Sequence, residues 1–164
     1  MQEVLLDKVV VNMGVGADPD EMKKAIQIIK LVTGKKPAQT ICVARIPDWG
    51  LRPGIPIGLK VTLRGNEAVE FLKKAIQAKA GKIQSKSFDK EGNFGFGVRE
   101  YIDLPGAKYD PKLGIKGFDV IVALKKKGYR VKKRRIRPTL VGKKQRVTKA
   151  DAVSFAESLG IQVE

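Results

Sequence analysis

Three stretches of the chain carry apolar residues at every third or fourth position, the spacing that lines one side of a helix. They span residues 18–34, 66–81 and 148–160. The first opens on Asp18, an N-cap residue type followed directly by proline, and the third pairs Thr148 with Asp151 in a capping-box pattern. Each stretch also reaches a glycine, the residue that commonly follows the end of a helix. The pattern predicts three helices that pack through their apolar sides.

Five other stretches alternate apolar and polar residues, the period of a strand with one buried face. They span residues 8–13, 40–45, 59–64, 98–104 and 118–124. In the third of them the alternation is strict, and Lys60, Thr62 and Arg64 fall on the polar side. Segments 46–58 and 85–97 are rich in glycine, proline or both and are predicted to be loops. A sheet covered by helices on one side would leave the polar side of these strands open.

The positive charge is concentrated in one segment. Thirteen of the 33 Lys and Arg residues, and none of the 17 Asp and Glu residues, lie in 125–149. The 164-residue chain has a formal net charge of +16, so the rest of it is close to neutral. A near-neutral body with one strongly basic segment is typical of a protein that binds a polyanion. Nucleic acid is the favoured partner, and an acidic membrane surface or a merely solubilising segment are the alternatives.

The residue inventory argues against catalysis and against a bound metal. The chain contains no histidine and one cysteine, Cys42, which excludes imidazole-based triads, thiolate clusters and an internal disulfide. Gly14 and Gly16 resemble the start of a dinucleotide-binding fingerprint, but Pro19 occupies the position of its third glycine. We therefore expect no enzyme activity, no cofactor and no metal, and we interpret Cys42 as a buried thiol in a strand. The lone cysteine, together with the absence of a signal-peptide or membrane-spanning pattern, predicts a soluble protein of a reducing intracellular compartment.

The predicted loop at 46–58 holds the only tryptophan of the chain. Loops of this length are often functional. Trp49, with Arg52 close by in sequence, either stacks on a nucleic-acid base or folds back to cover the core. The sequence leaves both alternatives open.

Three long motifs occur in a fixed order: KVVVNMGVG at 8–16, RPGIPIGLKVTLRG at 52–65, and SFD followed by GN and GVRE between 87 and 100. In this order they resemble large-subunit ribosomal protein family five, the universal binders of 5S ribosomal RNA. The resemblance covers nearly all of residues 4–124. It implies an α+β fold, a curved and largely antiparallel sheet with helices packed on one face and the other face open for RNA. It also implies a structural constituent of the cytoplasmic ribosome that attaches 5S ribosomal RNA in the central protuberance.

The resemblance also assigns sites by position. The residues expected to contact 5S ribosomal RNA lie in the first strand, in the turn after the first helix and on the polar side of 59–64: Lys8, Asn12, Lys36, Gln39, Lys60, Thr62 and Arg64. The loop at 48–57 corresponds to the family's transfer-RNA loop, with P-site transfer RNA contacts expected at Trp49, Arg52, Pro53 and Ile55. A bridge to the small-subunit head through ribosomal protein thirteen of that subunit is implied as well.

After residue 124 the chain departs from the bacterial pattern and resembles the archaeal and eukaryotic branch. Roles for the basic segment are inferred from its charge alone. We expect phosphate contacts to large-subunit ribosomal RNA from Lys125, Lys126, Lys127, Arg130, Lys132, Lys133, Arg134, Arg135, Arg137, Lys143, Lys144 and Arg146. Residues 1–164 are expected to form a single domain, in which the basic segment precedes a C-terminal helix at 148–159.

A DNA-binding protein and an enzyme acting on RNA are the competing functions. A DNA reader needs a helix rich in Arg, Asn or Gln for the major groove, and the outer side of 66–81 offers only Lys73, Lys74, Gln77 and Lys79. An enzyme needs an acid–base pair or metal-binding carboxylates, and the sequence contains no convincing set of either. A structural RNA-binding protein is therefore the favoured interpretation.

Overall fold

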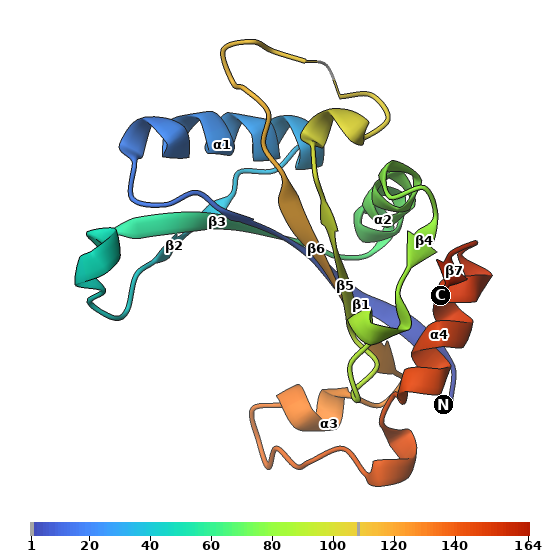
Figure 1. The fold of residues 1–164 in the computed structure, drawn as a ribbon. Coiled ribbons are helices and arrows are strands. Elements are labelled where there is room, and N and C mark those ends of the chain that lie inside the picture. The colour runs from blue at the N-terminus through green and yellow to red at the C-terminus, as the bar shows by residue number, and fades with distance from the viewer. Residues whose placement is uncertain (1, 108) are drawn as a thin grey trace.

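The chain forms one five-stranded antiparallel sheet with helices on one side of it, in a computed structural model that describes residues 2–107 and 109–164 (Figure 1). The strand order is β2-β3-β1-β6-β5, and a separate two-stranded parallel sheet pairs β4 with β7. The strands are β1 (Val4–Gly14), β2 (Ala38–Ile41), β3 (Pro56–Leu63), β4 (Lys82–Ile83), β5 (Phe94–Val98), β6 (Phe118–Lys126) and β7 (Gln162–Val163). The helices are α1 (Pro19–Thr33), α2 (Asn66–Ala78), α3 (Arg130–Lys133) and α4 (Lys149–Ser158).

The three predicted helices are confirmed as α1, α2 and α4, and their ends follow local capping chemistry. The Asp18 carboxylate accepts the N–H of Asp20 at 2.9 Å, and Gly34 takes the left-handed conformation (φ 69°) that closes α1. Before α4, Thr148 and Asp151 exchange side-chain and backbone hydrogen bonds as a complete capping box. These signals act within a few residues, which is why the sequence predicts them well.

Two of the five predicted strands are placed differently. The strand expected at 40–45 ends at Ile41, so Cys42 lies after it; the thiol is buried as predicted and is 2.8 Å from the Ala44 carbonyl oxygen. The strand expected at 98–104 is wrong. The structure places β5 at Phe94–Val98, inside a segment predicted to be a loop, and forms a 3₁₀ turn at Tyr101–Asp103. The glycines of this edge strand suggested a loop, although the aromatic residues between them are buried.

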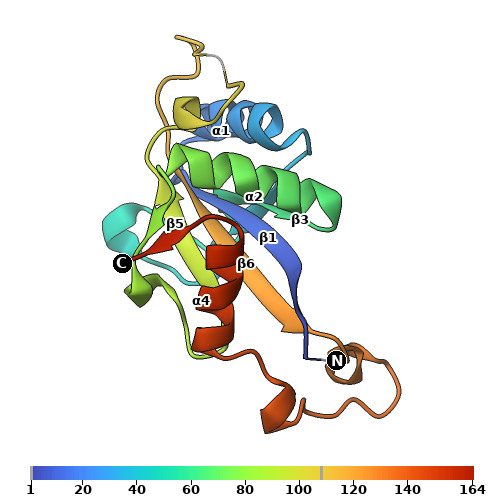
Figure 2. The same ribbon diagram turned by 90° about the vertical axis from the view of Figure 1, so that its right-hand side faces the viewer.

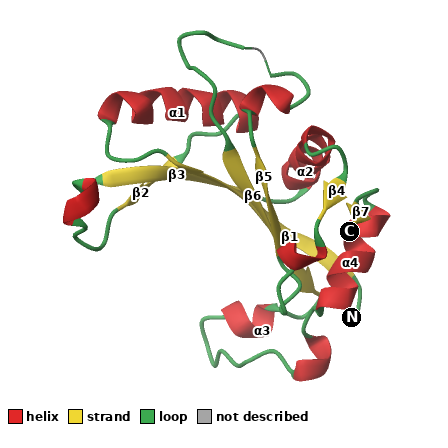
Figure 3. Cartoon of the chain, viewed as in Figure 1, coloured by secondary structure: helices red, strands yellow, loops and turns green. Residues whose placement is uncertain are grey.

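Helices cover only one face of the sheet, as predicted. Helix α1 packs over β3 and α2 over β1, and in the turned view α2 and α4 lie in front of the strands (Figure 2). The sheet is curved, and the basic segment around α3 lies on its other, uncovered side (Figure 3). The core takes alternate strand residues, among them Val9, Val11, Met13, Leu59, Val61, Leu63, Val120 and Val122. In the part of the chain that is described, no helix is long and apolar enough to cross a membrane.

Candidate nucleic-acid interface

The uncovered face of the sheet brings together several residues that lie far apart in sequence. The register pairs Asn12 with Lys60, and Val10 with Thr62, across β1 and β3. Paired residues of an antiparallel sheet point to the same side and lie about 5 Å apart. Lys60 and Thr62 are exposed, whereas Lys8 and Asn12 are half-buried on the same face. The structure therefore gathers Lys8, Asn12, Lys60 and Thr62 into one patch, which we call the open face.

The centre of the open face carries short polar and apolar side chains and one carboxylate. Strand β6 adds Asp119 and the exposed Ile121, which pair with Gly97 and Gly95 of β5. The two glycines present only backbone there, so that edge of the face carries no projecting side chain. Neutral hydrogen-bonding and apolar groups suit riboses and bases, and flanking lysines suit phosphates. Asp119 and Ile121 are not among the predicted site residues, although the alternation of 118–124 puts them on the side opposite the buried Phe118 and Val120.

The turn before β2 joins the open face only in part. The register pairs Ala38 with Lys60, so Ala38 shares the open face, whereas Gln39 pairs with Leu59 and points to the helix-covered side. Gln39 is exposed because β2 is an edge strand of the sheet. Lys36 is exposed in the turn that leads into β2. The structure therefore separates Gln39 from the other predicted 5S-binding residues.

A carboxylate at one end of the open face holds three cations. The register of β1 shifts between Leu6 and Lys8, which makes Asp7 an extra, bulged residue. The Asp7 carboxylate lies 2.8 Å from the Lys125 ammonium, 3.0 Å from that of Lys133 and 3.7 Å from the Arg64 guanidinium. Burial raises the pKa of Asp7, but the hydrogen bonds from the two lysines outweigh it and hold the pKa below the usual value. We call this group the Asp7 cluster; it joins the basic segment to the sheet.

One predicted phosphate contact is buried. Lys126 is only 7% exposed, and its ammonium lies 2.6 Å from the Asp151 carboxylate at the start of α4. This ammonium and the Thr148 N–H together lower the pKa of Asp151. Lys126 therefore joins β6 to α4 and does not reach a surface where RNA would lie.

Most of the other cations of the basic segment are exposed around α3 and the loops beside it (Figure 1). Lys127 forms an ion pair with Glu3 at 2.6 Å, and the guanidinium groups of Arg134 and Arg146 donate to backbone carbonyls. Besides Arg134 and Arg146, seven exposed cations of the basic segment form no ion pair with any described residue: Arg130, Lys132, Arg135, Arg137, Lys143, Lys144 and Lys149. These side chains are free to meet phosphates.

The loop between β2 and β3 presents its tryptophan to solvent. Cys42 and Ile55 share a backbone hydrogen bond of 2.8 Å, and an isolated bridge joins Ile46 to Leu51, so the loop is a twisted extension of the hairpin. Trp49 sits at its tip in a short 3₁₀ turn and is 72% exposed. The alternative in which the Trp49 ring folds back to cover the core is therefore wrong. The expected transfer-RNA residues nearby are the exposed Arg52 and Pro53 and the half-buried Ile55.

Comparison with known proteins assigns the family. Residues 1–52 match the family model described as ribosomal protein L5, and residues 56–155 match the ribosomal L5P family C-terminus. The chain is 48% identical to the large ribosomal subunit protein uL5 of Pyrobaculum aerophilum, over 100% of this chain and 92% of that protein. It is 48% identical to uL5 of Archaeoglobus fulgidus with the same coverage, and 44% identical to uL5 of Nanoarchaeum equitans over 99% and 97%.

The predicted resemblance is therefore confirmed, including its archaeal character. These matches also confirm a structural protein rather than an enzyme, since the family consists of constituents of the large ribosomal subunit. The chain belongs to the L5 family of ribosomal proteins.

Proposed function

We propose that this large-subunit ribosomal protein binds 5S ribosomal RNA through its open face and attaches it in the central protuberance of the cytoplasmic ribosome. The observation that carries the proposal is an antiparallel sheet left uncovered on one side, whose open face presents lysines and short hydrogen-bonding side chains. An antiparallel sheet can leave one face to solvent, and this face offers hydrogen-bonding groups for a polar partner rather than a broad apolar patch. A second RNA surface, the basic segment, borders the same side of the sheet (Figure 3).

The two surfaces make different contributions to binding. Asn12 and Thr62 are short and neutral, so they reach riboses or base edges only when RNA lies flat on the sheet. The exposed lysines and arginines of 125–149 reach phosphates from many directions and add affinity without sequence preference. Lys126 is left out of this role because its ammonium is buried against Asp151. The open face thus supplies specificity, and the basic segment supplies electrostatic attraction.

The hairpin loop at 42–55 serves a different partner in this proposal. Trp49 provides a free aromatic face for stacking, and Arg52 provides a cation beside it. We assign these residues, with Pro53 and Ile55, to P-site transfer RNA. The family resemblance further supports a bridge to the small-subunit head through ribosomal protein thirteen of that subunit.

We also propose that the chain is a single domain. Strand β1, from the part matched by the first family model, lies between β3 and β6, which come from the part matched by the second. Neither part would keep the five-stranded sheet without the other.

Competition binding tests the open face as the specificity surface. The double variant Asn12→Ala/Thr62→Ala should lose about 1–2 kcal/mol of binding free energy for each hydrogen bond to 5S ribosomal RNA. Its binding free energy for an unrelated RNA of equal length should hardly change. Changing Arg130, Lys132, Lys143 and Lys144 to Gln should weaken binding of both RNAs alike and reduce the slope of log affinity against log salt. Ser154→Ala, an exposed change on α4, is the control for hydroxyl loss away from the site. If the double variant weakens both RNAs equally, the open face is not the specificity surface.

A further inference from the structure

Strand β5 is a free edge of the five-stranded sheet. Its start is covered, because Phe88 bridges to Phe94 and the Asp89 N–H donates to the Asn93 carbonyl at 2.9 Å. The N–H and C=O groups of successive residues alternate between the two sides of an antiparallel strand. Asn93 points its carbonyl away from β6, so every second residue after it also points its N–H and C=O away from β6. Gly97 is one of these residues, and among the described residues nothing accepts its N–H on the outer side. An unpaired N–H on the edge of a sheet can pair with another strand.

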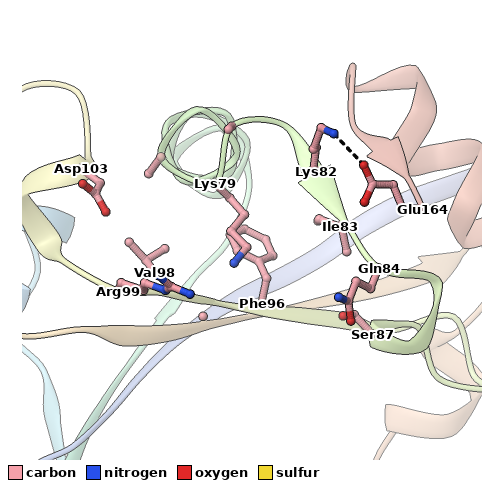
Figure 4. Close-up of a pocket in the computed structure, with 13 residues that line it drawn as sticks. Lys79, Lys82, Ile83, Gln84, Ser87, Phe96, Val98, Arg99, Asp103 and Glu164 are labelled. Carbon is pink, nitrogen blue, oxygen red and sulfur yellow. Dashed lines mark hydrogen bonds and ion pairs between the residues drawn. The ribbon is translucent and has the colours of Figure 1, made fainter.

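A second edge, which is free only in part, faces the first one. Strand β4 uses its odd-numbered residues to pair with β7: the Glu164 N–H donates to Ile83 at 3.1 Å and the Gln162 N–H to Gly81 at 2.8 Å. The backbone of Lys82 and that of Gln84 therefore point to the other side of β4. There the Lys82 N–H donates to the Lys79 carbonyl at 3.5 Å and the Gln84 carbonyl accepts the Ser87 N–H at 2.9 Å, so the Lys82 carbonyl and the Gln84 N–H are the groups left for a partner among the described residues. Between the two edges lies a groove of about 520 Å³, lined by the end of α2, by β4 and by β5 (Figure 4).

The lining of this groove combines an apolar floor with cations at its rim. Phe96, Val98 and Ile83 supply the floor and are buried. Lys79 and Arg99 are exposed and form no ion pair within the described ranges, whereas Lys82 is paired with Glu164 at 2.7 Å (Figure 4). Asp103 forms no ion pair with any described residue and lies at the far end of the lining from Glu164 (Figure 4). The available charge beside the β5 edge is thus mainly positive.

We propose that this groove binds an extended acidic segment of a protein partner, which adds as a strand between β5 and β4. Its main chain pairs with the outward groups of Gly97 and of β4, its apolar side chains rest on Phe96 and Ile83, and its carboxylates meet Lys79 and Arg99. A nucleic acid has no alternating N–H and C=O row to match two strand edges, so the geometry favours a peptide. The groove lies beside the end of α2, on the helix-covered side, and this partner is separate from the RNA proposed for the open face.

The test uses the full chain and a defined probe, the acetylated and amidated peptide Glu-Val-Glu-Val-Glu. Binding followed by amide NMR should shift the signals of residues 95–99 and 82–84 and slow the hydrogen exchange of Gly97. Gly97→Pro removes an N–H that takes no part in the β5–β6 ladder, a change that edge strands tolerate. This variant should bind the peptide about tenfold more weakly, whereas Gly97→Ala keeps the N–H and should stay within about twofold. The alanine Cβ would lie 3.4 Å from the Asp119 carboxylate, a contact that a small shift relieves.

A charge swap gives a second measurement that does not depend on the fold of the proline variant. Arg99→Glu should weaken binding of the acidic peptide and strengthen binding of the matched peptide Lys-Val-Lys-Val-Lys. The proposal is overturned if the acidic peptide shifts only the amide signals of the basic segment, if it shifts no groove amide, or if Gly97→Pro and Arg99→Glu leave its affinity unchanged. It is also overturned if an oligouridylate, and not the peptide, perturbs the amides of 95–99.

Discussion

Asp7→Asn is the most informative single change, because Asp7 balances three cations that are expected to bind RNA. Its side chain is 10% exposed, but the side chains of Lys125 and Lys133 are 37% and 59% exposed and keep much of their hydration. An exposed ion pair contributes about 0.2–1 kcal/mol, and breaking a buried pair costs about 3–5 kcal/mol. The Asp7 cluster lies between these limits, so we expect Asp7→Asn to lower the free energy of unfolding by about 1–2 kcal/mol.

RNA binding should change in the opposite direction. Without the carboxylate, the cations of the Asp7 cluster are free to pair with phosphate, so affinity for an unrelated RNA should rise. The slope of log affinity against log salt should steepen by about 0.7–0.9 for each additional phosphate contact. Preference for 5S ribosomal RNA should fall, because the basic segment loses its attachment to the sheet.

The pH dependence has a defined sign. The pKa of Asp7 is lower in the folded chain than its ordinary value of 3.8, so its contribution to stability is present above that value. The contribution is lost as the pH falls through the folded-state pKa. The difference in stability between wild type and Asp7→Asn should therefore shrink in acid, as measured by urea unfolding at several pH values.

Glu157→Gln is the matched control. Glu157 is an exposed carboxylate on α4 with no ion pair among the described residues, so its substitution changes the net charge equally and disturbs no cluster. If the two variants show the same salt slope and the same stability, the Asp7 cluster has no role in positioning the basic segment.

Three further variants test other parts of the structure. Trp49→Ala should weaken transfer-RNA binding by about 1–3 kcal/mol, the scale of one base stacked on an aromatic ring, and leave 5S binding unchanged in gel-shift assays. Asp151→Ala removes the capping box of α4 and leaves the Lys126 ammonium buried without its partner. Urea unfolding should therefore show a free energy of unfolding that is lower by about 2–4 kcal/mol, and adding Lys126→Met should recover part of the loss. Cys42→Ser should cost less than about 1 kcal/mol, because the hydroxyl can donate to the Ala44 carbonyl that the thiol now approaches; a larger loss would show that the apolar contacts of the sulfur dominate.

The sequence by itself determined the three longer helices α1, α2 and α4, three of the five strands of the main sheet and the polarity of the open face. Capping at Asp18 and Thr148 and the alternation of 59–64 depend on neighbours only a few residues away. The concentration of charge in 125–149 is likewise a property of the sequence alone, as are the ordered motifs that indicate the family. Such local patterns survive any arrangement of the rest of the chain, which is why they are predicted correctly.

Only the tertiary structure decided how the cations are used. Asp7 meets Lys133 across 126 positions of sequence, and Lys126 is buried while the next lysine, Lys127, remains exposed. The side on which Gln39 lies depends on its register with β3, and the exposure of Trp49 depends on how its hairpin extends from the sheet. Long side chains of one type look alike in a sequence. Their roles differ because burial and charge pairing are set by strands and helices that are distant along the chain.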